Sequence, residues 1–132
     1  MVDALRQARR WIAPSGCVID LHPTADIASV IVGGSVAGPI DPGGAIARHQ
    51  AASDAIAAAV RERLFTIETA IEFEFSTYAD SLQELHEHIL EDWREARIGE
   101  ATMARARTLI AQHAGPVCVR ERVAATRCVQ AP

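Results

Sequence analysis

The sequence predicts one α/β domain over residues 1–132, with a small mixed sheet of three main strands plus a short hairpin, and helices packed on it. Four segments carry apolar residues every three to four positions, which is the period of an amphipathic helix. Two later segments alternate apolar and polar residues, which is the period of a strand with one wet face. A short apolar run at residues 17–19 follows a proline and a glycine, and such a run is typical of a strand covered on both faces in a parallel sheet.

The composition fits a globular domain and excludes several classes of function. Apolar residues make up 49% of the 132 residues, and the net charge is −4. A general nucleic-acid binder is usually basic, so we expect no nucleic-acid partner. All 13 basic residues are arginines, so no lysine amine is present to form a Schiff base or to act as a general base.

The sequence also argues against a membrane partner and against export. No stretch is apolar for about 18 residues, the length that a helix needs to cross a bilayer. Charged residues within the first six positions do not fit the apolar core of a signal peptide. The cysteines, Cys17, Cys118 and Cys128, are odd in number and form no CxxC pair, which predicts reduced thiols. We therefore expect a cytoplasmic protein.

The order of elements follows from these periods and from the residues that interrupt them. In sequence they are a helix over 2–12, the strand at 17–19, a hairpin of 29–32 and 35–37, a helix over 44–63, a strand over 65–75, a helix over 82–96, a helix over 100–113 and a strand from 117. Gly33 and Gly34 supply the hairpin turn. The segment 44–63 is rich in alanine, the best helix former. Residues 80–84 are placed to form a capping box at the start of the next helix.

The two alternating segments are predicted to pair with each other. In the first, one face collects Phe65, Ile67, Ile71, Phe73 and Phe75, and the other collects Glu68, Glu72 and Glu74. In the second, one face collects Val117, Val119, Val123 and Ala125, and the other collects Arg120 and Arg122. Pairing would bring arginines opposite glutamates across the ladder. Such exposed pairs stabilise by only about 0.2–1 kcal/mol each, but they help to set the register.

The start of the chain carries a motif in which an arginine-rich helix end runs through a proline–glycine turn into an apolar strand. Its residues are Leu5, Arg9, Arg10, Trp11, Ile12, Pro14, Gly16, Cys17, Val18 and Ile19. This motif resembles the region before and through the fifth strand of class I S-adenosylmethionine-dependent methyltransferases, with Ser15 in place of the usual first glycine. The two alternating strands look like the sixth and seventh strands of that fold, an antiparallel pair at one edge of the sheet. The resemblance covers nearly the whole chain and implies the C-terminal half of that fold.

The resemblance also implies that this chain lacks the family's cofactor-binding half. That half holds a first strand, a Gly-x-Gly loop and an acidic residue for the ribose, whereas only eight residues precede Arg9 here. No cofactor-binding residue is assigned, and we expect S-adenosylmethionine to bind only if an N-terminal half is supplied. Because a strand left without its neighbour promotes association, we expect a homodimer in which a second copy covers residues 17–19.

Asp20 and His22 are the residues expected to face a substrate. Their spacing places both side chains on one face of a strand, and the resemblance places them at the carboxyl end of a central strand, where ligands of open α/β sheets bind. His22 would act there as a general base or as a substrate contact. The alternative is a turn histidine before Pro23, so the catalytic residues remain unassigned.

Two further clusters are weighed against simpler explanations. Glu84, His88 and Asp92 repeat every four residues on one helix face and could offer ligands to a metal, although the same pattern describes the solvated side of an amphipathic helix. His49 and Ser53 also share a helix face, but a nucleophile–base pair would need a third group to orient the histidine. No metal is therefore expected.

Two functions are predicted from these observations. The first is a methyltransferase-like domain without its cofactor-binding half, inactive alone, which would transfer a methyl group to a small molecule if completed. The alternative is a non-enzymatic oligomeric module that binds a small ligand under the Gly/Pro-rich segment of residues 24–44. Whether the protein is an enzyme stays open between them.

Overall fold

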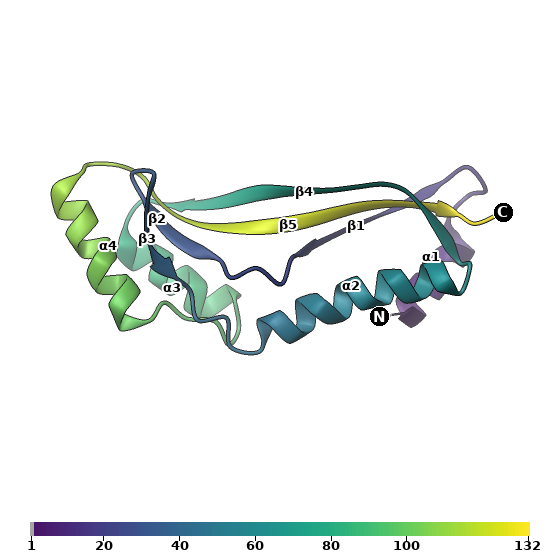
Figure 1. Ribbon diagram of the computed structural model, residues 1–132, viewed down its shortest axis with the longest axis horizontal. Helices are drawn as coiled ribbons and strands as arrows, with labels where there is room; N and C mark the ends of the chain where they lie inside the picture. Colours follow the sequence, from purple (N-terminus) through teal and green to yellow (C-terminus); the bar gives the residue numbers. More distant parts are fainter. Residues whose placement is uncertain (1) are drawn as a thin grey trace.

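The structure is a computed structural model that describes residues 2–132 (Figure 1). Its elements are α1 (Val2–Trp11), β1 (Cys17–Pro23), β2 (Ser29–Val32), β3 (Ser35–Pro39), α2 (Ala45–Arg61), β4 (Phe65–Ala79), α3 (Leu82–Asp92), α4 (Glu100–Gln112) and β5 (Val117–Gln130). Every helix and strand expected from the sequence is present, and the mixed α/β class is confirmed. β1 and β4 each continue four residues beyond their predicted ends, and α3 ends four residues before its predicted end.

The sheet has five strands, and every neighbouring pair among the described residues is antiparallel. β5 lies in the centre. β4 follows one of its edges along the whole length, β1 and β2 share the other edge one after the other, and β3 lies outside β2. The predicted mixed sheet with a parallel strand is therefore wrong.

β1 is an edge strand, not a central strand covered on both faces. Among the residues that the structure describes, β1 pairs with β5 alone, and Ile19 is 63% exposed while Val18 packs against the core. The prediction failed because three apolar residues are too few for periodicity to distinguish one-sided from two-sided burial. The sheet therefore does not confirm the methyltransferase resemblance, which remains a prediction.

The turns and caps predicted from local sequence are confirmed. Gly33 and Gly34 have φ angles of 55° and 85°, as a tight hairpin between β2 and β3 requires. The Ser81 hydroxyl accepts a hydrogen bond from the Glu84 amide at 3.1 Å. The Glu84 carboxylate in turn accepts one from the Asp80 amide at 2.6 Å, which completes the cap of α3.

β4 contains a bulge at Glu68 that reverses the direction of its apolar side chains. Before the bulge, Ile67 lies opposite Cys128; after it, Phe73 lies opposite Val123. Opposed residues of an antiparallel pair share a face, and Cys128 and Val123 are an odd number of positions apart on a regularly paired β5, so they face opposite ways. The prediction that all the apolar residues of β4 share one face is wrong. We call the two sides the Val119 face and the Cys128 face, after the β5 residues that they carry.

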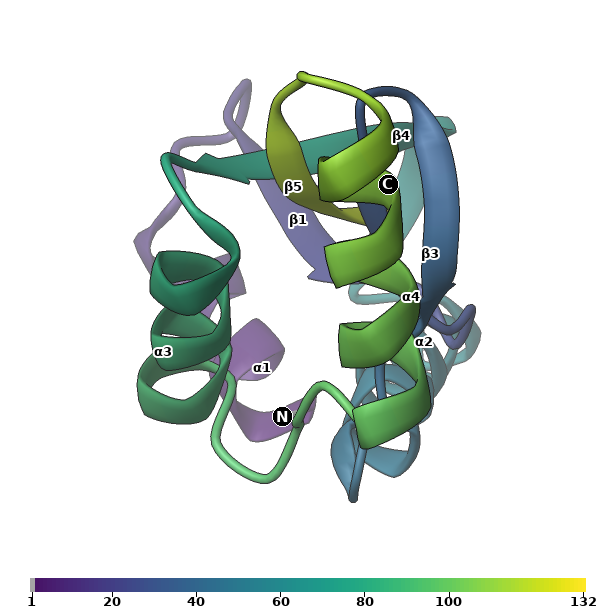
Figure 2. The ribbon, with the colours of Figure 1, turned by 90° about the vertical axis from the view of Figure 1, so that its left-hand side faces the viewer.

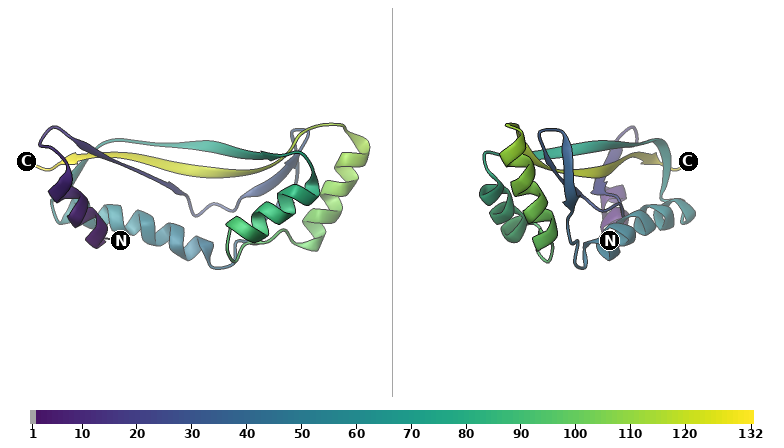
Figure 3. Two further views of the ribbon diagram at one scale, coloured as in Figure 1. Left: turned by 180° about the vertical axis from the view of Figure 1, so that it is seen from behind. Right: turned by 60° about the vertical axis from the view of Figure 1, so that its left-hand side comes forward.

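Two separate apolar clusters form the core, one at each end of the sheet. The first joins α3 and α4 to Val117 and Val119, and so covers the Val119 face. The second joins α1 and α2 to Phe65 and Cys128, and so covers the Cys128 face. Long paired strands twist along their length, so both helical pairs lie on one side of the molecule in Figure 1. Figure 2 shows α3 and α4 side by side at one end, and Figure 3 shows α1 next to α2 at the other.

The predicted pairing of glutamates with arginines is confirmed. Arg120 and Arg122 each contact the glutamate that lies two positions away from the β4 residue directly opposite. Arg122 lies 3.5 Å from Glu72, and Arg120 lies 3.9 Å from Glu74. Both arginines point to the Cys128 face, opposite the valines of β5.

A stretch of the Val119 face beyond α3 and α4 is open and apolar. Its exposed side chains, on β1 and β4, are Ile19, Leu21, Ile71, Phe73 and Phe75. Together with the outer edge of β1, this surface has the character that favours association with another chain. The homodimer stays a prediction. Within residues 2–132, no helix combines the length and the apolar content that a bilayer crossing needs.

Candidate functional site

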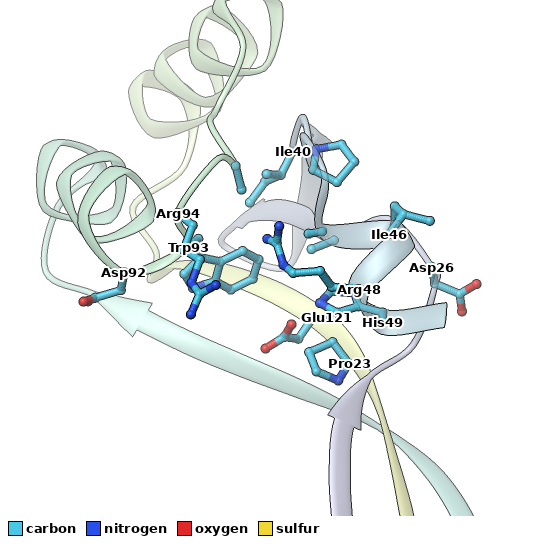
Figure 4. Close-up of a pocket in the computed structure, with 14 residues that line it drawn as sticks. Pro23, Asp26, Ile40, Ile46, Arg48, His49, Asp92, Trp93, Arg94 and Glu121 are labelled. Atoms are coloured by element: carbon cyan, nitrogen blue, oxygen red, sulfur yellow. The ribbon is translucent and has the colours of Figure 1, made fainter. Parts of the chain in front are cut away.

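A cavity of about 290 Å³ opens where β1 ends and the Gly/Pro-rich segment begins (Figure 4). It is lined by Pro23, Asp26, Ala28, Ile40, Pro42, Ala45, Ile46, Arg48, His49, Asp92, Trp93, Arg94, Ala96 and Glu121. Its walls come from β1, β5, the start of α2 and the end of α3. The cavity thus lies between the first apolar cluster and the amino-terminal half of α2, under the segment that the sequence suggested.

Glu121 is the charged residue that β5 turns toward this cavity. The alternation of the strand sends its neighbours Arg120 and Arg122 to the opposite face, where Glu74 and Glu72 engage them. Within residues 2–132 no ion pair forms on Glu121 itself, and burial raises the pKa of its carboxyl.

The other charged groups that line the cavity are engaged elsewhere or exposed. Asp26 lies 3.7 Å from Arg122, and Asp92 lies 2.7 Å from His88. Arg48 lies 3.5 Å from Glu95, outside the lining. Arg94 stands on the exposed rim. Glu121 is therefore the half-buried charge that a ligand in the cavity would meet.

Two ring systems complete the lining. His49 donates from Nδ1 to the Thr24 carbonyl at 3.1 Å, because a carbonyl oxygen only accepts, and this leaves Nε2 as an acceptor. Burial lowers the pKa of His49, so the ring is held neutral. Trp93 ends α3, and Figure 4 shows its indole and the Glu121 carboxyl turned toward the middle of the cavity. Arg94 follows with φ 54°, a left-handed turn that lets the chain leave the helix beside the cavity.

Asp20 and His22 share a face of β1, as predicted, and their side chains are hydrogen-bonded to each other. His22 Nδ1 lies 2.6 Å from Asp20 Oδ2, and His22 Nε2 lies 2.9 Å from Ser53 Oγ of α2. The sequence offered His49 as the partner of Ser53, but the structure gives that role to His22. His49 is committed to Thr24 instead.

The predicted metal candidates on α3 do not come together as one site. Glu84 is used in the helix cap, while His88 and Asp92 form a pair at 2.7 Å. In the part of the chain that the structure describes, no group of three histidine, cysteine or acidic side chains gathers as metal ligands would.

Neither Glu121 nor Trp93 was predicted from the sequence as a site residue. A signal for Glu121 was present, because it stands at an alternation position that otherwise carries valine, between Val119 and Val123. A charged residue at a strand position that otherwise carries apolar residues is exposed, paired with another group, or placed there for a function. Trp93 gave no such signal, because its spacing fits the apolar stripe of α3 and it does pack at the border of the first cluster.

No protein-family model matches this sequence, and neither a curated protein nor a solved structure matches it. The geometry of the chain is therefore the basis for the function proposed below.

Proposed function

We propose that this chain binds a small organic amine with an apolar body in the cavity beside Glu121. The observation that carries the proposal is a half-buried carboxyl, without an ion pair in the described chain, next to an indole ring. An ammonium group satisfies such a carboxylate and is also attracted to the face of Trp93. Ile40, Ile46 and Ala96 supply apolar wall for the rest of the ligand.

The neutral ring of His49 adds a second polar contact. Its Nε2 accepts a hydrogen bond, so the lining offers a ligand a second acceptor besides Glu121. The volume of about 290 Å³ lies at the small end of ligand pockets, which suits a single ring with a short amine chain.

Phenethylamine is expected to bind the protein more tightly than phenethyl alcohol, which has the same ring and chain but no positive charge. Glu121→Gln should weaken phenethylamine about tenfold and leave the alcohol unchanged, since the substitution removes only the charge. Because the pKa of Glu121 is raised, amine binding should fall as the pH drops through that raised pKa, and the variant should lose this dependence. Isothermal titration calorimetry at several pH values measures both effects.

Glu74→Gln is the matched control, because Glu74 lies on the same ribbon but on the opposite face, and it should bind phenethylamine like the wild type. Equal affinity for the amine and the alcohol, or a Glu121→Gln variant that binds the amine as well as the wild type, would contradict the proposal.

A second candidate function is methyl transfer to the bound molecule by an assembly in which another polypeptide segment supplies the cofactor-binding half. The supporting observation is that β1 and β4 run in the same direction on the two sides of β5, with the antiparallel β4–β5 pair at one edge and the outer edge of β1 unpaired within residues 2–132. The residues present do not fit S-adenosylmethionine. The glycines at 33 and 34 close a hairpin, and the Gly33 amide donates to the Pro116 carbonyl at 2.9 Å, so they do not form an open loop before a helix.

The purified chain is therefore expected to show no saturable binding of S-adenosylmethionine up to about millimolar concentration, a Kd that corresponds to about −4 kcal/mol. Calorimetric titration tests this expectation. Micromolar binding would show that the chain holds a cofactor site of its own and would overturn the assignment of the cofactor to a separate half.

A further inference from the structure

A second cavity, of about 310 Å³, lies on the Cys128 face and shares no lining residue with the cavity beside Glu121. It is lined by His22, Ser53, Ile56, Ala70, Ile71, Glu72, Ala124 and Thr126. The Asp20–His22–Ser53 chain of hydrogen bonds opens into this cavity through Ser53, which is exposed. The small-molecule function proposed above makes no use of these groups.

With Asp20 ionised and His22 neutral, the chemistry of the partners assigns the protons of this chain of hydrogen bonds. An ionised carboxylate only accepts, so at 2.6 Å the Nδ1 of His22 carries the proton and donates to Asp20. The Nε2 of a neutral imidazole is then an acceptor, and at 2.9 Å it receives the hydroxyl proton of Ser53. The other acceptor near that hydroxyl, the His49 carbonyl of the same helix, is farther away at 3.5 Å.

Both elements that carry the three residues are regular, which fixes their positions. Asp20 lies opposite Thr126 and His22 opposite Ala124 in an unbroken ladder with β5. Ser53 lies in the middle of α2, whose next turns are buried against the second apolar cluster. The side chains of His22 and Asp20 are 11% and 21% exposed, so the histidine is shielded while the serine faces the cavity.

We propose that Ser53 is an activated nucleophile, with His22 as its general base and Asp20 as the residue that positions His22, and that the site takes small acyl esters. The Ser53 oxygen forms a bond to the ester carbonyl carbon while its proton passes to His22 Nε2. The bond between that carbon and the alkoxy oxygen then breaks, and the departing alcohol takes the proton from His22. A water molecule then gives a proton to His22 Nε2 and bonds to the acyl carbon, the bond from that carbon to the Ser53 oxygen breaks, the carboxylic acid leaves, and the proton returns from His22 to Ser53.

The carbonyl oxygen of the substrate needs a donor as charge develops on it. Amides in the middle of α2 are committed to the helix, so a main-chain oxyanion hole is not available at Ser53. Thr126 supplies a hydroxyl on the wall of the same cavity, and within residues 2–132 its side chain makes no hydrogen bond. One donor instead of two predicts slow turnover, so covalent capture is the sharper test.

The test is labelling of the whole protein with a fluorophosphonate probe, in which the serine oxygen forms a bond to phosphorus, fluoride leaves and His22 takes the serine proton. Peptide mass spectrometry should find the label on Ser53. His22→Gln should lower the labelling rate about 100-fold or more, the contribution typical of a general base. Asp20→Asn should lower the rate as well, and Asp20→Glu, which restores the carboxylate, should recover part of it.

Thr108→Ala is the matched control, because Thr108 is also a hydroxyl residue inside a helix, bonded to the carbonyl four positions earlier, but without a histidine. It should be labelled at Ser53 like the wild type, and circular dichroism confirms that each variant is folded. Locating the label on Ser53 requires only the wild-type protein. Absence of label on Ser53 in the folded wild type, or equal rates for the wild type and His22→Gln, would overturn the proposal. Neither result would bear on amine binding beside Glu121, since the two cavities are separate.

Discussion

Replacing Phe65 with alanine is expected to lower the free energy of unfolding by about 3–5 kcal/mol, the range for a large aromatic side chain removed from a core. Phe65 is 2% exposed and lies in the second apolar cluster with Leu5, Ile56 and Cys128. These partners come from α1, α2 and β5, so the cavity left behind has walls on several elements and cannot collapse easily. Urea denaturation followed by circular dichroism measures the loss.

The control is Phe75→Ala on the same strand. Phe75 lies beyond the bulge on the open part of the Val119 face and is 50% exposed. Removing a side chain that is already half in water should cost no more than about 1 kcal/mol in the isolated chain. Equal losses for the two variants would contradict the reversal of faces at Glu68, since it assigns one phenylalanine to the core and the other to the surface.

Deleting Glu68 is expected to destabilise the protein more than any single substitution on β4. The deletion removes the extra residue of the bulge, so one side of the strand must slip by one position relative to β5. Either Phe65 and Ile67 leave the Cys128 face, or Phe73 and Phe75 turn into it, and both outcomes place side chains on the wrong side. The loss should exceed that of Phe65→Ala, and circular dichroism should show little cooperative unfolding.

Glu68→Ala keeps the bulge and removes only the side chain. That carboxylate lies 2.5 Å from Arg127, and both groups are about half exposed, so the loss should be about 0.2–1 kcal/mol. A deletion variant that unfolds at the same urea concentration as Glu68→Ala would show that the strand register does not depend on the bulge.

The position of each element could be predicted from the sequence, because helix caps, turn glycines and alternating residues are local signals. The pair of glycines at 33 and 34 and the cap at Ser81 are examples that the structure confirms. The sheet topology could not be predicted in the same way, because the partner of a strand is chosen over long separations. β1 pairs with a segment about a hundred residues away, and its short apolar run gave no information about that partner.

The candidate sites also combine features set by local sequence with features set by long-range packing. The bond between Asp20 and His22 follows from their spacing of two on a strand, which a sequence shows directly. Ser53 joins them across space, from a helix whose rotation about its axis is set by packing against the second cluster. A bulge such as that at Glu68 has no reliable signature in a strand where nearly every second residue is apolar. The sequence therefore predicts a single face for all the apolar residues of β4.

The two apolar clusters share no residue, and the β4–β5 ribbon connects them, with one cluster packed at each of its ends. Rotation of one end about the ribbon axis leaves both interiors intact and strains chiefly the strands between them. The cavity beside Glu121 lies at this junction, with walls from the border of the first cluster and from the start of α2. A molecule bound there would contact both ends of the protein, and we expect its binding to restrict rotation of one end relative to the other.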